Sequence, residues 1–67
     1  MIPDLDIFRS AKLLVKHHGQ DAPIYAAMRA DAMLEAGDLY GYAVFKRILR
    51  AIESLQGTAP KSGEEVH

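Results

Sequence analysis

The residues best suited to chemistry include a histidine pair, His17–His18. Adjacent helical residues point about 100° apart, so the two imidazoles cannot bind the same metal ion. A zinc site needs further ligands at characteristic spacing, and the only other histidine, His67, lies near the end of the chain. We therefore expect His18 at the edge of the core, His17 in solvent, and no metal site.

Two carboxylates, Asp31 and Glu35, are four residues apart and share one face of a predicted helix. Such a pair can do acid–base work or bind a divalent ion, but no histidine or third acidic ligand is nearby in the sequence. Both fall near the end of the helix, where the helix dipole disfavours negative charge. We interpret them as a solvated or salt-bridged face with a basic neighbour in this chain or on a partner.

The sequence predicts no catalytic residue and no cofactor. No serine or threonine lies in a strained turn beside a candidate base, and the glycines are isolated, so there is no phosphate-binding loop. The absence of cysteine excludes a thiol nucleophile, thiolate metal ligands and disulfides. We expect the protein not to be an enzyme.

Six of the eight basic residues form two stripes on predicted helices. The stripes comprise Arg9, Lys12 and Lys16, and Lys46, Arg47 and Arg50. Such stripes can follow phosphates, but a net charge of −1 lacks the basic excess of a dedicated nucleic-acid binder. We interpret the stripes as a solvated surface, with weak nucleic-acid binding or an acidic protein partner as alternatives.

Three predicted helices position these residues. They cover residues of about 4–18, 22–36 and 39–56. Each break combines a glycine, Gly19 or Gly37, with a following aspartate, Asp21 or Asp38. Glycine ends a helix in a left-handed conformation, and aspartate accepts backbone N–H groups at the start of the next. The predicted fold is all-α, an up-down-up three-helix bundle formed by residues 1–56.

Spacings of three and four predict which faces are buried. The predicted buried face, or arc, of the helix over 4–18 contains Ile7, Phe8, Ala11, Leu14, Val15 and His18. That of the helix over 39–56 contains Gly41, Val44, Phe45, Ile48, Leu49, Ala51, Ile52 and Leu55. Gly41 is a poor helix former in a first helical turn. It indicates either close backbone contact with the preceding helix or a position that tolerates glycine near a fraying end.

The helix over 22–36 is apolar nearly all round. Its first face carries Ala26, Ala27, Ala30, Met33 and Leu34, and its second carries Ile24, Tyr25, Met28 and Ala32. A helix of this kind is either buried by both neighbours or shared with a partner. The grouping of an aromatic residue with a methionine on the second face is typical of an interaction patch. We expect it to bind an unknown protein partner or a second copy.

Composition places the chain among globular proteins, with 49% hydrophobic and 25% charged residues. The longest apolar run is Ile24 to Met28, whereas a membrane span needs about 20 residues. The acidic N-terminal segment lacks the pattern of a signal peptide. We expect a cytoplasmic, non-catalytic interaction or regulatory module without membrane contact.

Several segments resemble a family of short all-helical proteins, mostly alphaproteobacterial. They are residues 18–24, 27–31, 37–39 and 45–49, within a likeness that covers about residues 4–55. The resemblance implies a small helical domain. It assigns no activity, cofactor, partner or site residue.

The C-terminal segment, residues 57–67, has no apolar periodicity and is predicted to be a disordered tail. Truncation after Gly57 should therefore change the free energy of unfolding by less than about 1 kcal/mol. Thermal unfolding followed by circular dichroism measures this change. A large fall in the melting temperature would show that the tail docks on the helices.

Overall fold

The structure, a computed structural model, describes residues 2–57 and is all-helical over that range, which confirms the predicted all-α class. Helix α1 spans Asp4–His18, α2 spans Ala22–Glu35, α3 spans Leu39–Gln56, and a short 3-10 turn, η1, spans Gly19–Asp21. These bounds match the predicted helices, except that α2 ends one residue before Ala36. The predicted disordered tail lies outside the described residues from position 58 onward.

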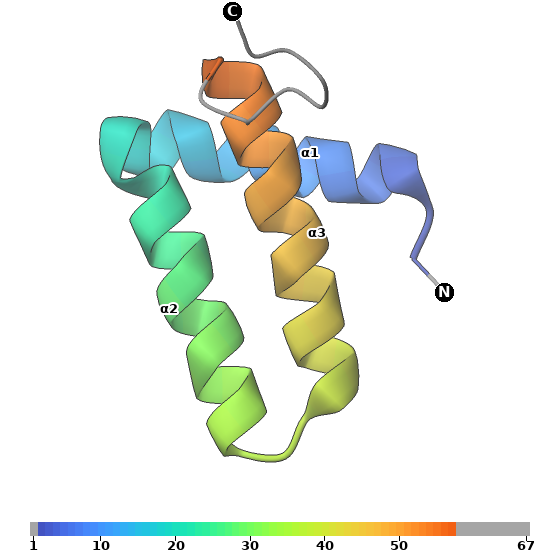
Figure 1. The fold of residues 1–67 in the computed structure, drawn as a ribbon. Helices are drawn as coiled ribbons and strands as arrows, with labels where there is room; N and C mark the ends of the chain where they lie inside the picture. Colours follow the sequence, from blue (N-terminus) through green and yellow to red (C-terminus); the bar gives the residue numbers. More distant parts are fainter. Residues whose placement is uncertain (1, 58–67) are drawn as a thin grey trace, which may run out of the picture.

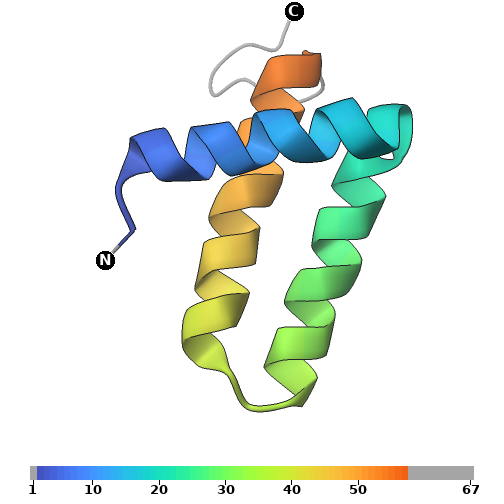
Figure 2. The ribbon, with the colours of Figure 1, turned by 180° about the vertical axis from the view of Figure 1, so that it is seen from behind.

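Helices α2 and α3 form an antiparallel hairpin, and α1 lies crosswise over one end of it (Figure 1). The reverse view shows the same relation, with α1 in front of α3 (Figure 2). The up-down-up arrangement is therefore not confirmed, because η1 directs α2 away from the axis of α1. The central helix is α3, which packs against both others, whereas α1 and α2 share few contacts.

The core lies where α1 crosses the hairpin. Its buried side chains are Ile7, Ala11, Ala22, Ala26, Ile48 and Ile52. The contribution of α2 to this cluster consists of alanines, whose short side chains leave room for the isoleucines of α3. Burial of one such isoleucine contributes about 1.5–3 kcal/mol, so the packing of α3 supplies much of the stability.

Some residues of the predicted buried arcs remain exposed. They are Phe8, His18, Leu34 and Leu55. Because α1 covers only one end of the hairpin, Leu34 at the other end has no third helix above it (Figure 1). The periodicity identifies the inward direction correctly, but it carries no information on how far along the hairpin the covering helix extends.

The turn between α2 and α3 follows the predicted glycine–aspartate pattern. Gly37 has a φ of 80°, and the amides of Gly37 and Asp38 donate to the carbonyls of Leu34 and Met33 at 3.0 and 2.8 Å. These bonds satisfy carbonyls that the end of α2 leaves without helical partners. The Asp38 carboxylate then accepts a hydrogen bond from the Gly41 amide at 2.8 Å, which confirms the predicted cap of α3.

The prediction that Asp21 caps the start of α2 is wrong. Asp21 makes no side-chain capping bond, because its backbone has φ −85° and ψ −2° instead of the extended conformation of a capping residue. The chain runs through η1 directly into α2. Gln56 at the end of α3 donates to the Gly19 carbonyl at 2.8 Å and so ties this turn to the hairpin.

Gly41 lies close to the side chain of Met33 on α2 and to that of its own capping residue, Asp38. These neighbours are side chains, so the close backbone contact predicted for this glycine stays a prediction. A Cβ atom at this position would lie 2.6 Å from Oδ2 of Asp38 and 2.9 Å from the sulfur of Met33. The thioether of Met33 can move, because methionine is flexible. The carboxylate of Asp38 can move only if it loses the hydrogen bond from the Gly41 amide with which it caps α3.

Alanine in place of Gly41 tests this contact. The replacement normally stabilises a helix by about 0.5–1 kcal/mol, but here it displaces a cap that contributes about 1 kcal/mol. We expect Gly41→Ala to leave the free energy of unfolding unchanged or lower in urea denaturation. In an Asp38→Ala background, where no cap remains to be lost, Gly41→Ala should be stabilising. An equal effect in both backgrounds would contradict the steric account.

Candidate functional site

A group of apolar side chains lies on the side of α2 turned away from α3. We call the residues of the predicted second face, Ile24, Tyr25, Met28 and Ala32, the α2 outer face. The exposed fractions of Ile24 and Met28 are 61% and 65%, and Ala32 is also exposed. They lie opposite the buried Ala22 and Ala26, so no described residue of the chain covers them.

Tyr25, at the edge of this face, is half-buried and stacks on His18. The two ring centroids are 4.3 Å apart with an interplanar angle of 14°. His18 is exposed instead of lying at the edge of the core, and His17 is in solvent as expected. Within residues 2–57, no three histidine, cysteine or acidic side chains are grouped so as to hold a metal ion. Of the two histidines, it is therefore His18 that contributes a ring stack, and this stack orients Tyr25.

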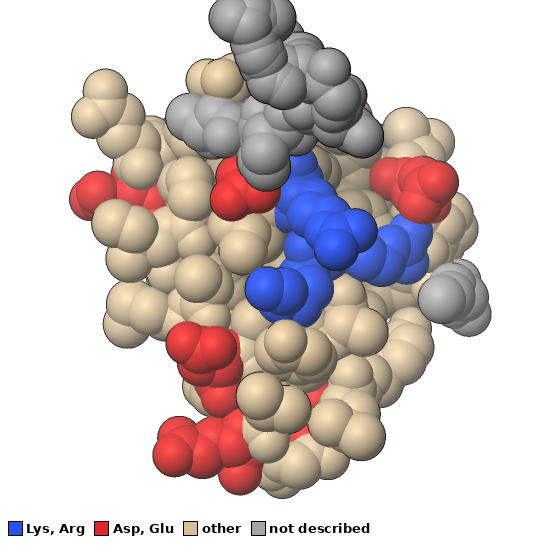
Figure 3. Space-filling model, in the orientation of Figure 1, with Lys and Arg blue, Asp and Glu red and all other residues tan. Residues whose placement is uncertain are grey.

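Asp31 and Glu35 extend the α2 outer face toward the tip of the hairpin. On a helix with about 100° per residue, Asp31 lies about 20° from Ile24 and about 60° from Met28, and Glu35 lies about 20° from each of them. Both are exposed, and neither forms an ion pair with any described residue. The basic neighbour expected for them is thus not found within the described part of this chain. Figure 3 shows acidic side chains at this end of the molecule, well apart from the basic ones.

The basic stripe of α3 is partly used to hold the N-terminal segment. Arg47 forms an ion pair with Asp4 and donates from Nη1 to the Ile2 carbonyl at 2.9 Å. Lys46 lies 6.0 Å from the ring centre of Tyr42. Figure 3 shows these basic side chains gathered over α3. Arg47 is therefore a structural residue, which removes one cation from the predicted anion-binding stripe.

The basic stripe of α1 lies on the side of that helix opposite its buried Ile7 and Ala11. Its residues are Arg9, Lys12 and Lys16, which line a shallow hollow together with Leu13. Helix α3 is in front of α1 in Figure 1 and behind it in Figure 2, so the two stripes face opposite sides of the molecule. They do not form one continuous basic face.

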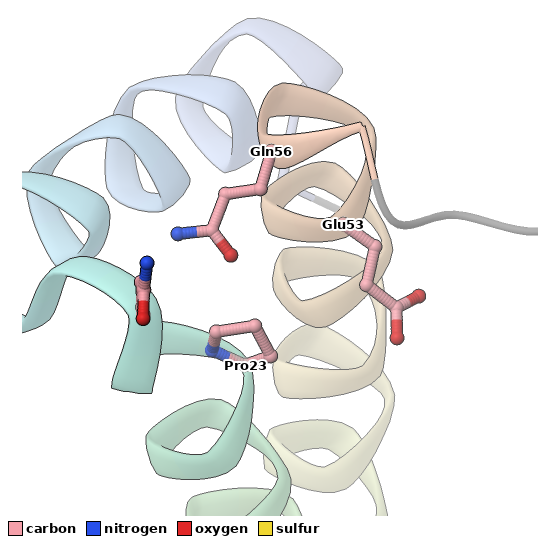
Figure 4. Close-up of a pocket in the computed structure, with 4 residues that line it drawn as sticks. Pro23, Glu53 and Gln56 are labelled. Atoms are coloured by element: carbon pink, nitrogen blue, oxygen red, sulfur yellow. The ribbon is translucent and has the colours of Figure 1, made fainter.

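A hollow of about 640 Å³ lies between the start of α2 and the last turns of α3. Its lining residues are Gln20, Pro23, Glu53 and Gln56. Figure 4 shows the Gln56 amide directed toward the start of α2 and the Glu53 carboxylate directed away from it. Since Gln56 is engaged with the Gly19 carbonyl, this lining offers one carboxylate and no nucleophile. It provides no acid–base pair for catalysis.

No helix in the described part of the chain is long and apolar enough to cross a membrane. Comparison with protein-family models, with curated proteins and with solved structures finds no match to this chain. The geometry of the described residues is therefore the basis for any functional proposal.

Sequence reasoning missed three contacts that the fold creates. They are the Arg47–Asp4 ion pair, the His18–Tyr25 stack and the placement of Arg29 5.6 Å from the ring centre of Phe45. In each case the partners come from different helices. No local signal in the sequence distinguishes Arg47 from the solvated arginines beside it, because helical periodicity places all of them on the polar side.

The role of Arg47 can be tested against Arg50, an exposed arginine on the same helix. Arg47→Gln should lower the free energy of unfolding by about 0.5–1.5 kcal/mol, mainly through loss of the hydrogen bond to the Ile2 carbonyl. The ion pair adds little, since Asp4 is fully accessible to water. Arg50→Gln should change stability by less than about 0.5 kcal/mol. Equal effects in urea denaturation would show that Arg47 does not hold the N-terminal segment.

Proposed function

We propose that the protein is a non-catalytic protein–protein interaction module and that the α2 outer face is its binding surface. The observation that carries this proposal is the exposure of Ile24 and Met28, one helical turn apart on the same side of α2. The core is built from the opposite side of the helix, so neither residue is needed to fold the hairpin.

The energetics of burial favour this use. Transfer of an isoleucine or methionine side chain from water to an apolar contact contributes about 1.5–3 kcal/mol. Both residues are already held on a folded helix, so a partner does not have to order the backbone that presents them. The Tyr25 ring, fixed by its stack on His18, adds a rigid aromatic group at the margin of the same surface.

Nucleic-acid binding, the alternative function, receives less support. Its basic stripes face opposite sides of the molecule, and Arg47 is engaged with Asp4 and the Ile2 carbonyl. A phosphate backbone is followed best by cations that share one surface, because each neutralised phosphate adds to the affinity. The described residues thus favour an apolar protein contact over an electrostatic one with DNA or RNA.

Site-specific photocrosslinking tests the proposed function. A photoreactive phenylalanine analogue at Ile24, in the full chain expressed in host cells, should give covalent adducts with protein after irradiation. The same analogue at Ser54, an exposed position of α3, serves as the control. Adducts specific to position 24 are expected, because the analogue would lie inside the contact.

The variant Met28→Glu makes this test specific to the α2 outer face. Because Met28 is exposed, the charge should leave the helical circular dichroism signal and the melting temperature nearly unchanged. It should abolish the adducts at position 24, since a carboxylate would be buried without a partner in the contact. Identical adducts at positions 24 and 54, or none at 24, would overturn the proposal.

A further inference from the structure

We propose that the α2 outer face, together with Asp31 and Glu35, binds the exposed side of α1 in a second copy of this chain. This inference rests on the proposed function, which does not identify the partner, and it names a second copy of the chain as that partner. The exposed side of α1, called here the α1 outer face, consists of Leu5, Arg9, Lys12, Leu13 and Lys16.

The α1 outer face has the apolar groups and the shape that such a contact needs. The exposed fractions of Leu5 and Leu13 are 58% and 55%. Leu13 lies in a shallow hollow whose other walls are the long side chains of Arg9, Lys12 and Lys16. The aliphatic stems of these cations can pack on an apolar side chain such as that of Met28 while their charged ends stay in water.

The charges of the two outer faces are opposite. Asp31 and Glu35 are exposed near the end of α2, where the helix dipole makes an unpaired carboxylate unfavourable. Lys12 and Lys16 are exposed and form no ion pair with a described residue. The one cation on α2, Arg29, is directed over Phe45 of α3 and does not offset the acidic residues. Each face thus carries the charge that the other lacks.

The spacing of these residues is the same on both helices. The order on α1 is Leu5, Lys12, Leu13, Lys16, and the order on α2 is Ile24, Asp31, Ala32, Glu35. If the two helices lie side by side in the same direction, a single shift along the helix axis aligns all four pairs. It places Leu5 level with Ile24, Lys12 with Asp31, Leu13 with Ala32, and Lys16 with Glu35. Apolar groups then meet apolar groups, and both lysines meet carboxylates. Met28 falls beside the stem of Arg9.

Pairing of two α2 outer faces lacks this match. In a parallel arrangement Asp31 and Glu35 of one copy would meet the same residues of the other, and in an antiparallel arrangement centred on Met28, Glu35 would approach Asp21. Like charges brought together in this way disfavour a contact. The complementary contact therefore joins two different faces. A two-fold pair, in which each copy uses both faces, closes the assembly as a dimer, whereas a single shared contact continues as an open chain.

Charge reversal on each face tests this pairing. The first variant carries Asp31→Lys and Glu35→Lys, and the second carries Lys12→Glu and Lys16→Glu. All four residues are exposed, so circular dichroism should show the wild-type helical content. In sedimentation velocity at low salt, wild type should self-associate, and each variant alone should do so at least about tenfold more weakly because like charges now face each other.

Two restorations separate the pairing from a general loss of fold or affinity. An equimolar mixture of the two variants should associate again, since every contact between unlike chains then joins opposite charges. A chain with all four substitutions should self-associate like wild type, because its charges are exchanged but still complementary. Association of wild type should also weaken as salt rises. Absence of either restoration overturns the pairing of these two faces.

Other outcomes distinguish this inference from the proposed function. Wild type that stays monomeric at all concentrations, or that associates equally well in both variants, overturns the inference. If photocrosslinking at Ile24 then yields adducts with a different protein that Met28→Glu abolishes, the α2 outer face is still a binding surface. A monomeric wild type that also forms no adduct at position 24 overturns both.

Discussion

Packing of small side chains against the two buried isoleucines of α3 is the interaction on which the rest of the structure depends. Ala22 and Ala26 of α2 and Ala11 of α1 are fully buried around Ile48 and Ile52. Alanine loses no side-chain entropy on burial and keeps the helix backbones close, so a short chain can form a dry core. The same choice makes α3 the central helix. It presents two large side chains, α2 approaches it through alanines, and α1 approaches it through Ala11 together with Ile7.

The crosswise position of α1 follows from this core and determines what remains exposed. The contact of α1 with α3 is concentrated around Ile7 and Ala11, so α1 covers the end of the hairpin near η1 and leaves the other end open (Figure 1). A helix lying along the hairpin would cover more of both partners. Leu34, at the open end, is exposed for that reason.

The distribution of charge is a second consequence of the same arrangement. Acidic residues without ion pairs lie on the outward side of α2, and basic residues line the outward side of α1, because both helices direct their small buried residues toward α3. Arg47, on the flank of α3 next to α1, is used to hold the first residues of the chain. The molecule therefore presents an acidic and a basic surface, each with exposed apolar side chains, which is a distribution suited to contacts with protein.

The sequence alone determined the helices, because their signals are local. Periodic apolar residues define the helix faces, and the glycine–aspartate break at Gly37 and Asp38 fixes the second turn through bonds that span only a few residues. The same pattern misled at Asp21, where the chain turns in a 3-10 helix and the carboxylate caps nothing. Only the tertiary structure decided that α1 crosses the hairpin, that Arg47 reaches Asp4, and that no described residue covers the outer face of α2. These features depend on which helix, distant in the sequence, occupies the space beside a residue. Periodicity cannot specify this neighbour, because it sets only the direction of a side chain on its own helix.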